Sequence, residues 1–119
     1  MNNLSIDLSG ALKRVDGDYA LLRMLAKSFL KSGPQMAERI SEAVSAKDLK
    51  KVATTAHTLK GTAALFDAHA LVEAAQRMEA AALAGQWENI ATEFELMRSE
   101  FAQVETALQD ILHLPALTA

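Results

Sequence analysis

The chain has 119 residues, of which 50% are hydrophobic and 23% charged, which is typical of one globular domain and argues against a disordered segment. It contains 23 alanines but only 5 glycines and 2 prolines, a balance that argues against a β-sandwich or barrel and favours helices throughout. The net charge of −3 disfavours nucleic-acid binding, the lack of cysteine excludes disulfides and thiolate chemistry, and no apolar run is long enough to span a membrane.

The N-terminal segment has no features of a secreted protein. Its first residues lack the basic start and apolar stretch of a signal peptide, so we expect a cytoplasmic location. Apolar residues then recur at helical spacing over a short stretch, namely Ile6, Leu8, Leu12 and Val15. This pattern predicts a small amphipathic helix ahead of the main elements.

A long helix is predicted over residues 18–46. Asp18 suits the N-cap position because it follows a turn signal at residues 16–17. The apolar residues alternate in steps of three and four, and they are Leu22, Ala26, Phe29, Gly33, Met36, Ile40 and Ala43. Since this register continues past Pro34, we expect a single helix that is kinked at the proline.

Two helices are predicted in the middle of the chain. The first covers residues 48–66, with Asp48 as a candidate N-cap and an apolar seam of Leu49, Val52, Ala56, Leu59, Ala63 and Phe66. The second covers residues 68–85, with an apolar stripe of Ala68, Leu71, Val72, Ala75, Met78, Ala82 and Leu83. Gly85 can adopt the left-handed conformation that ends many helices.

The last predicted helix covers residues 87–113 and is stopped by Pro115. Its apolar seam is Ile90, Phe94, Met97, Phe101, Val104, Leu108 and Ile111. The connections between the long helices have only two or three residues, so neighbouring helices should run antiparallel. The predicted fold is therefore all-α: an up-down-up-down four-helix bundle, with the short N-terminal helix covering one end and residues 1–119 forming a single domain.

Most kinds of chemical site are not encoded. There is no glycine-rich phosphate loop, and there is no Glu-x-x-His pair of the kind that di-iron bundles use. The three histidines, His57, His69 and His113, are not at the i,i+4 spacing of a metal site. We therefore expect no bound metal or cofactor, and we expect His69 and His113 to be solvated.

The helix predicted over residues 48–66 carries an unusual outward face. On a helical wheel His57 lies opposite the apolar seam, and the residues within about 60° of it are Lys50, Ala53, Thr54, Lys60, Gly61 and Ala64. Small residues replace the long polar side chains that usually cover such a face. Gly61 costs about 1 kcal/mol relative to alanine inside a helix, which suggests that a partner approaches closely there.

Two plainer interpretations of this face remain open from the spacing alone. A histidine on a helix surface is usually just solvated, and a lysine three residues after it occurs by chance. Gly61 could also pack against the short N-terminal helix.

The run of residues 56–66, Ala-His-Thr-Leu-Lys-Gly-Thr-Ala-Ala-Leu-Phe, resembles the signature of histidine-containing phosphotransfer (HPt) domains. The family pattern is His-x-hydrophobic-Lys-Gly-small-small, here His57, Leu59, Lys60 and Gly61 and the residues that follow. The similarity extends over nearly the whole chain, from residues 7–8 through 29–34 to the turn at 84–85. One departure is Asp67, where the family usually has glycine; aspartate can adopt the left-handed conformation at some cost and can cap the following helix.

The resemblance implies a phosphorelay intermediate. His57 would accept a phosphoryl group from a receiver-domain aspartate and pass it to the aspartate of another response regulator, with Lys60 stabilising the phosphate. The partners would be receiver domains and a sensor or hybrid histidine kinase, and the receiver would supply the Mg²⁺. The chain itself would be a monomeric phosphocarrier without kinase activity. Lys50, on the His57 face, could steer an acidic receiver surface.

Glu79 is a further candidate because the wheel places it inside the apolar stripe of residues 68–85. A carboxylate facing a neighbouring helix needs a hydrogen-bond partner, unless it reaches out to water at the edge of the stripe. The resemblance favours a partner, since HPt proteins often have Gln or Glu at this distance after the histidine. Glu79 would then orient the imidazole of His57.

Two other functions are compatible with a helical bundle. The chain could be an adaptor that binds partners and is never phosphorylated, although the intact His57, Lys60 and Gly61 argue against this. It could also self-associate as a coiled coil through the long seam of residues 87–113.

Overall fold

A computed structural model describes residues 5–113, which form five helices and no strand. The helices are α1 (Leu8–Arg14), α2 (Tyr19–Ser45), α3 (Leu49–Ala64), α4 (His69–Leu83) and α5 (Trp87–His113). The predicted helix bounds are confirmed to within two residues, and α2 continues through Pro34 as a single helix. Pro115, predicted to stop the last helix, lies outside the described residues.

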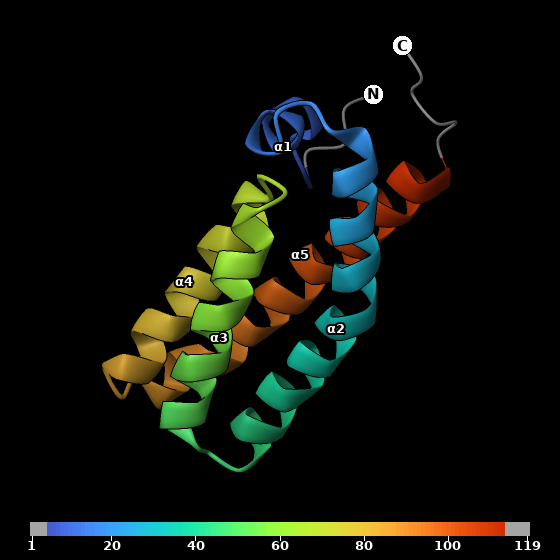
Figure 1. Cartoon of the computed structure of the whole chain (residues 1–119). Helices are drawn as coiled ribbons and strands as arrows, with labels where there is room; N and C mark the ends of the chain where they lie inside the picture. Colours follow the sequence, from blue (N-terminus) through green and yellow to red (C-terminus); the bar gives the residue numbers. More distant parts are fainter. Residues whose placement is uncertain (1–4, 114–119) are drawn as a thin grey trace.

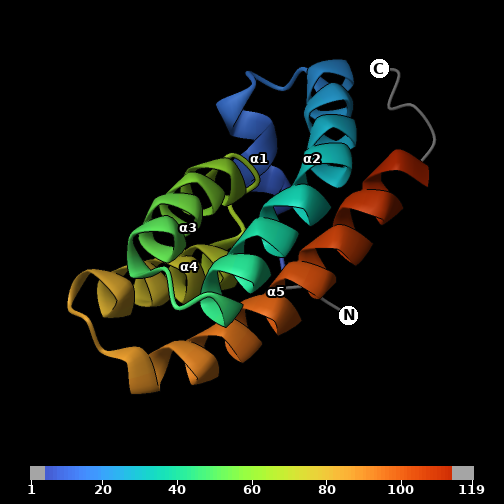
Figure 2. The same ribbon diagram turned by 90° about the horizontal axis from the view of Figure 1, so that it is seen from below.

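The four long helices form the predicted antiparallel bundle. α3 packs against α2 and α4, and α5 packs against the same two helices, so α3 and α5 lie at opposite corners. Figures 1 and 2 show this arrangement, with α1 lying at the end of the bundle next to the α3–α4 turn. Within residues 5–113, no helix combines the length and the apolar character needed to cross a lipid bilayer.

Aspartates start three of the helices. The side chains of Asp7, Asp18 and Asp48 each accept a hydrogen bond from the backbone N–H three residues later, at 3.0–3.1 Å. Asp18 and Asp48 are thus confirmed as N-caps. α4 differs, because its N-cap residue is Ala68 and makes no side-chain capping bond.

Asp67 lies in the left-handed conformation, with φ of 49°, but does not cap α4. Its carboxylate binds Arg14 instead, with Nε donating to Oδ1 over 2.8 Å. Its other oxygen fills the space where a side chain at Gly10 would be, and its carbonyl accepts a 3.3 Å bond from the N–H of Asp7. The expectation that Asp67 can cap α4 is therefore wrong, because a guanidinium is a stronger partner than a backbone N–H. The residue fastens α1 to the bundle.

All four connections close in the same way. In each, a backbone N–H donates to the carbonyl five residues earlier: Gly17 to Leu12, Asp48 to Ala43, Ala68 to Ala63 and Gln86 to Ala81. Each turn also contains a residue with positive φ, and Gly85 has this role at the end of α4 as predicted. The last three of these tight turns hold the four long helices antiparallel and side by side.

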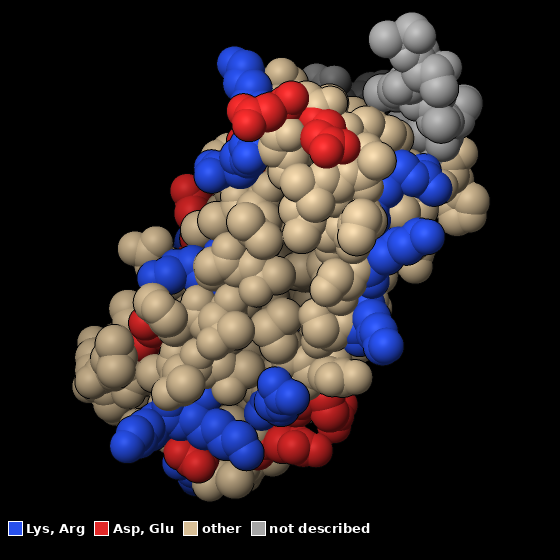
Figure 3. Space-filling model, viewed as in Figure 1, with Lys and Arg blue, Asp and Glu red and all other residues tan. Residues whose placement is uncertain are grey.

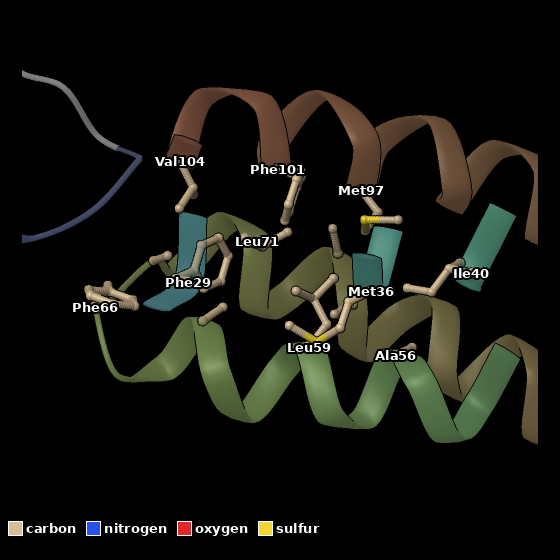
Figure 4. Close-up of a cluster of buried hydrophobic side chains, with 14 of the residues drawn as sticks. Phe29, Met36, Ile40, Ala56, Leu59, Phe66, Leu71, Met97, Phe101 and Val104 are labelled. Carbon is tan, nitrogen blue, oxygen red and sulfur yellow. The ribbon is translucent and has the colours of Figure 1, made fainter. Parts of the chain in front are cut away.

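The core is centred on three phenylalanines. The ring of Phe29 packs edge-on against Phe66, with centroids 5.7 Å apart, and lies 5.6 Å from the ring of Phe101. Figure 4 shows them with the methionines and aliphatic residues that fill the space between the helices. Gly33 lies under this cluster, where a Cβ would come within 2.9 Å of Phe101 and 3.1 Å of Phe29. Most residues of the predicted seams are thus buried or partly buried, and the opposite face of α3 is free to carry a site.

Candidate functional site

His57 lies in the middle of α3 and projects away from the core. Its side chain is 66% exposed, while its neighbours Ala56 and Leu59 are fully buried. The periodicity that buries the seam of α3 therefore turns the imidazole outward, as predicted.

Glu79 reaches His57 from the adjacent helix. The distance between Glu79 Oε2 and His57 Nδ1 is 3.0 Å, and the Glu79 side chain is only 18% exposed. This contact is possible because α3 and α4 are antiparallel and pack closely through small residues, including Ala53, Ala81 and Ala82. The wheel position of Glu79 inside the stripe is thus explained by a partner and not by exposure to water.

Lys60 completes a three-residue constellation. Its Nζ donates to Glu79 Oε1 over 3.0 Å, so the two carboxylate oxygens hold one partner each. The sequence reasoning assigned Lys60 to the phosphate and missed this ion pair. The ion pair could have been predicted from the spacing: Lys60 and His57 are three residues apart, so both lie on one side of α3 within reach of α4.

The electrostatics of the cluster decide which nitrogen of His57 is reactive. The hydrogen bond from Lys60 lowers the pKa of Glu79 against the opposing effect of desolvation, and the hydrogen bond with His57 lowers it further. Glu79 is therefore an ionised acceptor at neutral pH. Since a carboxylate can only accept, a neutral His57 carries its proton on Nδ1 and presents the lone pair of Nε2.

The remaining predicted site residues fall into two groups. Thr54, Gly61 and Lys50 are exposed and Ala64 is half-buried, so all four belong to the accessible face around His57. Gly61 borders open space, with no heavy atom within 4 Å of a Cβ built on it, so the interpretation that it packs against α1 is wrong. Ala53 is only 6% exposed and lies next to α4, since it shares a hollow with Glu79 and Leu83 of that helix. Its predicted place on the exposed face is therefore wrong, while its role in partner binding stays a prediction.

Leu83 is a residue of the site that sequence reasoning misplaced. The apolar stripe predicted it to be buried, yet it is 73% exposed, because it lies at the outer edge of that stripe. It lines an open hollow of about 360 Å³ together with Ala53, Thr54, His57, Thr58 and Glu79. One water takes about 30 Å³ in the liquid, so a phosphoryl group has ample room beside the imidazole.

Comparison with known proteins identifies the family. Residues 24–113, most of the chain, match the Hpt domain family. The chain belongs to this family. The structure is similar to the crystal structure of the HPT domain from a sensor hybrid histidine kinase of Shewanella, with a TM-score of 0.86 and 21% sequence identity over 97% of this chain and 99% of that one. At this identity the likeness supports the fold. No curated protein has a matching sequence.

Membership of the Hpt family indicates the general role of this chain. It takes part in histidine phosphotransfer within two-component phosphorelay signalling. Hpt domains are phosphotransfer carriers and not kinases, and they interact with histidine kinases and response-regulator receivers. The bundle fold and the short N-terminal helix agree with this family.

The other histidines of this Hpt domain have different surroundings. His113, at the end of α5, is exposed, and its Nδ1 lies 2.7 Å from the carbonyl of Gln109. His69 is also exposed and lies near Asp7 and Asp67, close enough for the three to share a metal ion. The Asp7 carboxylate caps α1, however, and the Asp67 carboxylate binds Arg14, so both already have partners within the chain.

Proposed function

We propose that His57 is the residue on which this Hpt domain carries the phosphoryl group. The observation that carries the proposal is the contact of Glu79 with Nδ1, which leaves Nε2 of an exposed imidazole as the nucleophile. The Nε2–P bond forms as the P–O bond to a receiver aspartate breaks, and the carboxylate leaves. The proton on Nδ1 stays there, and Glu79 offsets the positive charge that the ring acquires.

The neighbours of His57 support this chemistry in separate ways. Lys60 is one turn away and brings three donors on Nζ, of which Glu79 uses one, so it can also contact a phosphoryl group on His57. Gly61 leaves space beside the imidazole for the loops of a receiver. Lys50 adds positive charge on the same face, where it would attract an acidic receiver surface.

The proposal assigns the remaining parts of the reaction to the partner. The receiver holds the Mg²⁺ and the aspartate, while this chain binds no metal or cofactor and hydrolyses no ATP. A second receiver would take the phosphoryl group from His57 by the reverse of the first step. We place this relay in the cytoplasm and treat residues 1–119 as one monomeric domain.

The substitution His57→Gln tests the assignment. Purified receiver domains charged with acetyl phosphate are mixed with the wild-type chain and with the variant, and acid-labile phosphate on the chain is measured. We expect no label on His57→Gln, with a free energy of unfolding within about 1 kcal/mol of wild type because the side chain is exposed. His69→Gln and His113→Gln are the matched controls and should label normally.

Two results would contradict the assignment. Label that persists on His57→Gln would place the phosphoryl group elsewhere. A wild-type chain that binds receivers and is never labelled by any of them would favour the adaptor function.

A further inference from the structure

A groove of about 320 Å³ lies between α2 and α5, on the side of the bundle away from His57. His57 is on the edge that α3 and α4 form, since it contacts Glu79, and α5 occupies the corner opposite α3. Figure 2 shows α2 and α5 side by side, with α3 and α4 on the other side of the molecule. A partner in this groove would therefore leave the imidazole accessible.

The floor of the groove is apolar. Pro34 and Ala37 of α2 line it from one side, and Phe94 and Phe101 of α5 line it from the other. Phe101 is buried in the core, whereas Phe94 is only half-buried and offers part of its ring to a ligand. The volume corresponds to about ten water molecules, which is room for one long side chain and its immediate neighbours.

Two carboxylates border this floor without a partner. Glu38 is exposed and Glu105 is half-buried, and neither carboxylate forms an ion pair or a hydrogen bond with any residue of the described range 5–113. Burial raises the pKa of the Glu105 carboxyl, and within that range no cation opposes the rise. An ionised carboxylate in such a place is costly unless a cation pairs with it. Glu105 is therefore an acceptor that a ligand could satisfy.

Arg98, the cation that also lines the groove, is already engaged. Its guanidinium lies over the ring of Phe94, 5.8 Å from the centroid, and its Nη1 is 3.8 Å from Oε2 of Glu95. It is seven residues, or two helical turns, from Glu105. The end of the groove at Glu105 thus keeps its negative charge, and the contact at Phe94 shows that this aromatic surface suits a guanidinium.

We propose that the groove between α2 and α5 binds a segment of a partner protein that carries an arginine flanked by apolar side chains. The guanidinium would donate to Glu105 and Glu38, and the aliphatic stem and the flanking side chains would cover Pro34 and Phe94. Arginine fits better than lysine because its planar head can donate to both oxygens of one carboxylate. Such a partner would hold the Hpt domain while a receiver exchanges phosphate with His57, so the inference does not depend on the function of that histidine.

Two short peptides test the groove on the ¹⁵N-labelled chain. One is acetyl-Ala-Leu-Arg-Leu-Ala-amide, and the other has citrulline in place of arginine, which removes the charge and keeps the shape. We expect the arginine peptide to shift the amide signals of residues 34–41 and 94–105, and to bind about tenfold more tightly than the citrulline peptide. In Glu105→Gln the two peptides should bind equally. Glu100→Gln is the matched control and should keep the preference, because Glu100 is also half-buried but lies about 140° around α5 from Glu105.

A second measurement separates the groove from the site on α3. Receiver domains charged with acetyl phosphate are mixed with the chain, with and without a saturating amount of the arginine peptide. We expect the same rate of labelling in both samples, because the groove and His57 lie on different sides of the bundle. Slower labelling with the peptide would mean that it covers the face of His57, which would overturn the inference.

Three further results would also overturn it. The first is a lack of signal changes in the groove at millimolar peptide, and the second is equal binding of both peptides by wild type. The third is a loss of preference in Glu100→Gln as large as in Glu105→Gln, which would show attraction to the net charge of −3 and not to a site. Failure of the proposed function would appear separately, as a chain that binds the arginine peptide in the groove and takes phosphate from no receiver.

Discussion

At the scale of single residues, one carboxylate organises the site. Glu79 uses one oxygen for His57 and the other for Lys60, so it fixes the tautomer of the nucleophile and the position of the nearest cation together. An exposed imidazole without such a partner would exchange freely between its two neutral tautomers. The half-buried carboxylate thus gives an exposed histidine a defined chemistry.

Replacing Glu79 should expose this effect. In Glu79→Ala we expect His57 to populate both neutral tautomers and phosphorylation to slow about two- to tenfold, the value of one hydrogen bond. The tautomers are read from ¹⁵N chemical shifts of the imidazole, which a merely structural role of Glu79 would leave unchanged. Glu93→Ala is the matched control, because Glu93 makes a comparable 3.0 Å pair with Arg77 on the far side of α4. Identical imidazole spectra for Glu79→Ala and wild type would remove Glu79 from the site.

Lys60 has two possible partners, and the phosphorylated state should change its preference. In the resting protein it binds Glu79, while a phosphoryl group on Nε2 offers it a stronger charge. Lys60→Ala should therefore shorten the lifetime of the phosphohistidine about fivefold, equivalent to about 1 kcal/mol, while His57 can still be labelled. Lys50→Ala should leave this lifetime unchanged, and Lys60→Arg should restore part of it. Equal lifetimes for Lys60→Ala and wild type would show that Lys60 serves only Glu79.

At the scale of the helices, two glycines have opposite meanings. Gly33 in α2 is buried under Phe29 and Phe101, whereas Gly61 in α3 faces open space. Gly33→Ala should destabilise the protein by about 1–3 kcal/mol, because the added methyl overpacks the aromatic cluster. Gly61→Ala should be neutral or stabilise by up to about 1 kcal/mol, because alanine is the better helix former. Thermal unfolding of the two variants measures both effects. A stabilised Gly33→Ala would contradict the packing.

The larger variant Gly61→Gln distinguishes a steric effect on the approach of a receiver from an effect on folding stability. It should fold normally and fail to exchange phosphate with a receiver, because its side chain occupies the gap beside His57. Normal transfer by Gly61→Gln would show that the open space at Gly61 is incidental.

The helices themselves were predictable from the sequence because their signals are local. Periodic apolar residues and the caps Asp18 and Asp48 depend on neighbours within one or two turns, and the structure keeps them. His57 was predictable for the same reason, since the seam that turns it outward lies on its own helix. Ala53 and Leu83 were misplaced because their exposure depends on how closely α4 approaches α3, which no spacing within one helix records.

The turn at Asp67 also shows that contacts between distant parts of the chain cannot be predicted from local spacing. Its left-handed backbone was foreseen, but its side chain was expected to serve α4. It binds Arg14 and packs against Gly10, both more than fifty residues earlier in the chain. Such long-range partners appear only when α1 is placed against the end of the bundle.

At the scale of the whole molecule, the bundle separates stability from function. α5 and the inner faces of α2 and α4 supply much of the core, and α3 contributes one face to that core and exposes the other with His57. Charged residues gather toward the ends and edges of the view in Figure 3, which leaves the middle of the surface over α2 and α3 largely uncharged. A partner can therefore meet His57 on a rigid helix without disturbing the core.

The burial of the apolar seam of α5 bears on the oligomeric state. The residues that would pair in a coiled coil are buried within the chain's own bundle, among them Met97, Val104 and Leu108, which are fully buried. α2 also covers the end of this helix, since Tyr19 donates its hydroxyl to the carbonyl of Ile111 over 3.0 Å. The seam is thus unavailable to a second copy, and we expect a monomer. Light scattering coupled to size exclusion should give a mass of 12.8 kDa that does not change with protein concentration. A mass of twice that value which dissociates on dilution would show that another surface joins two copies.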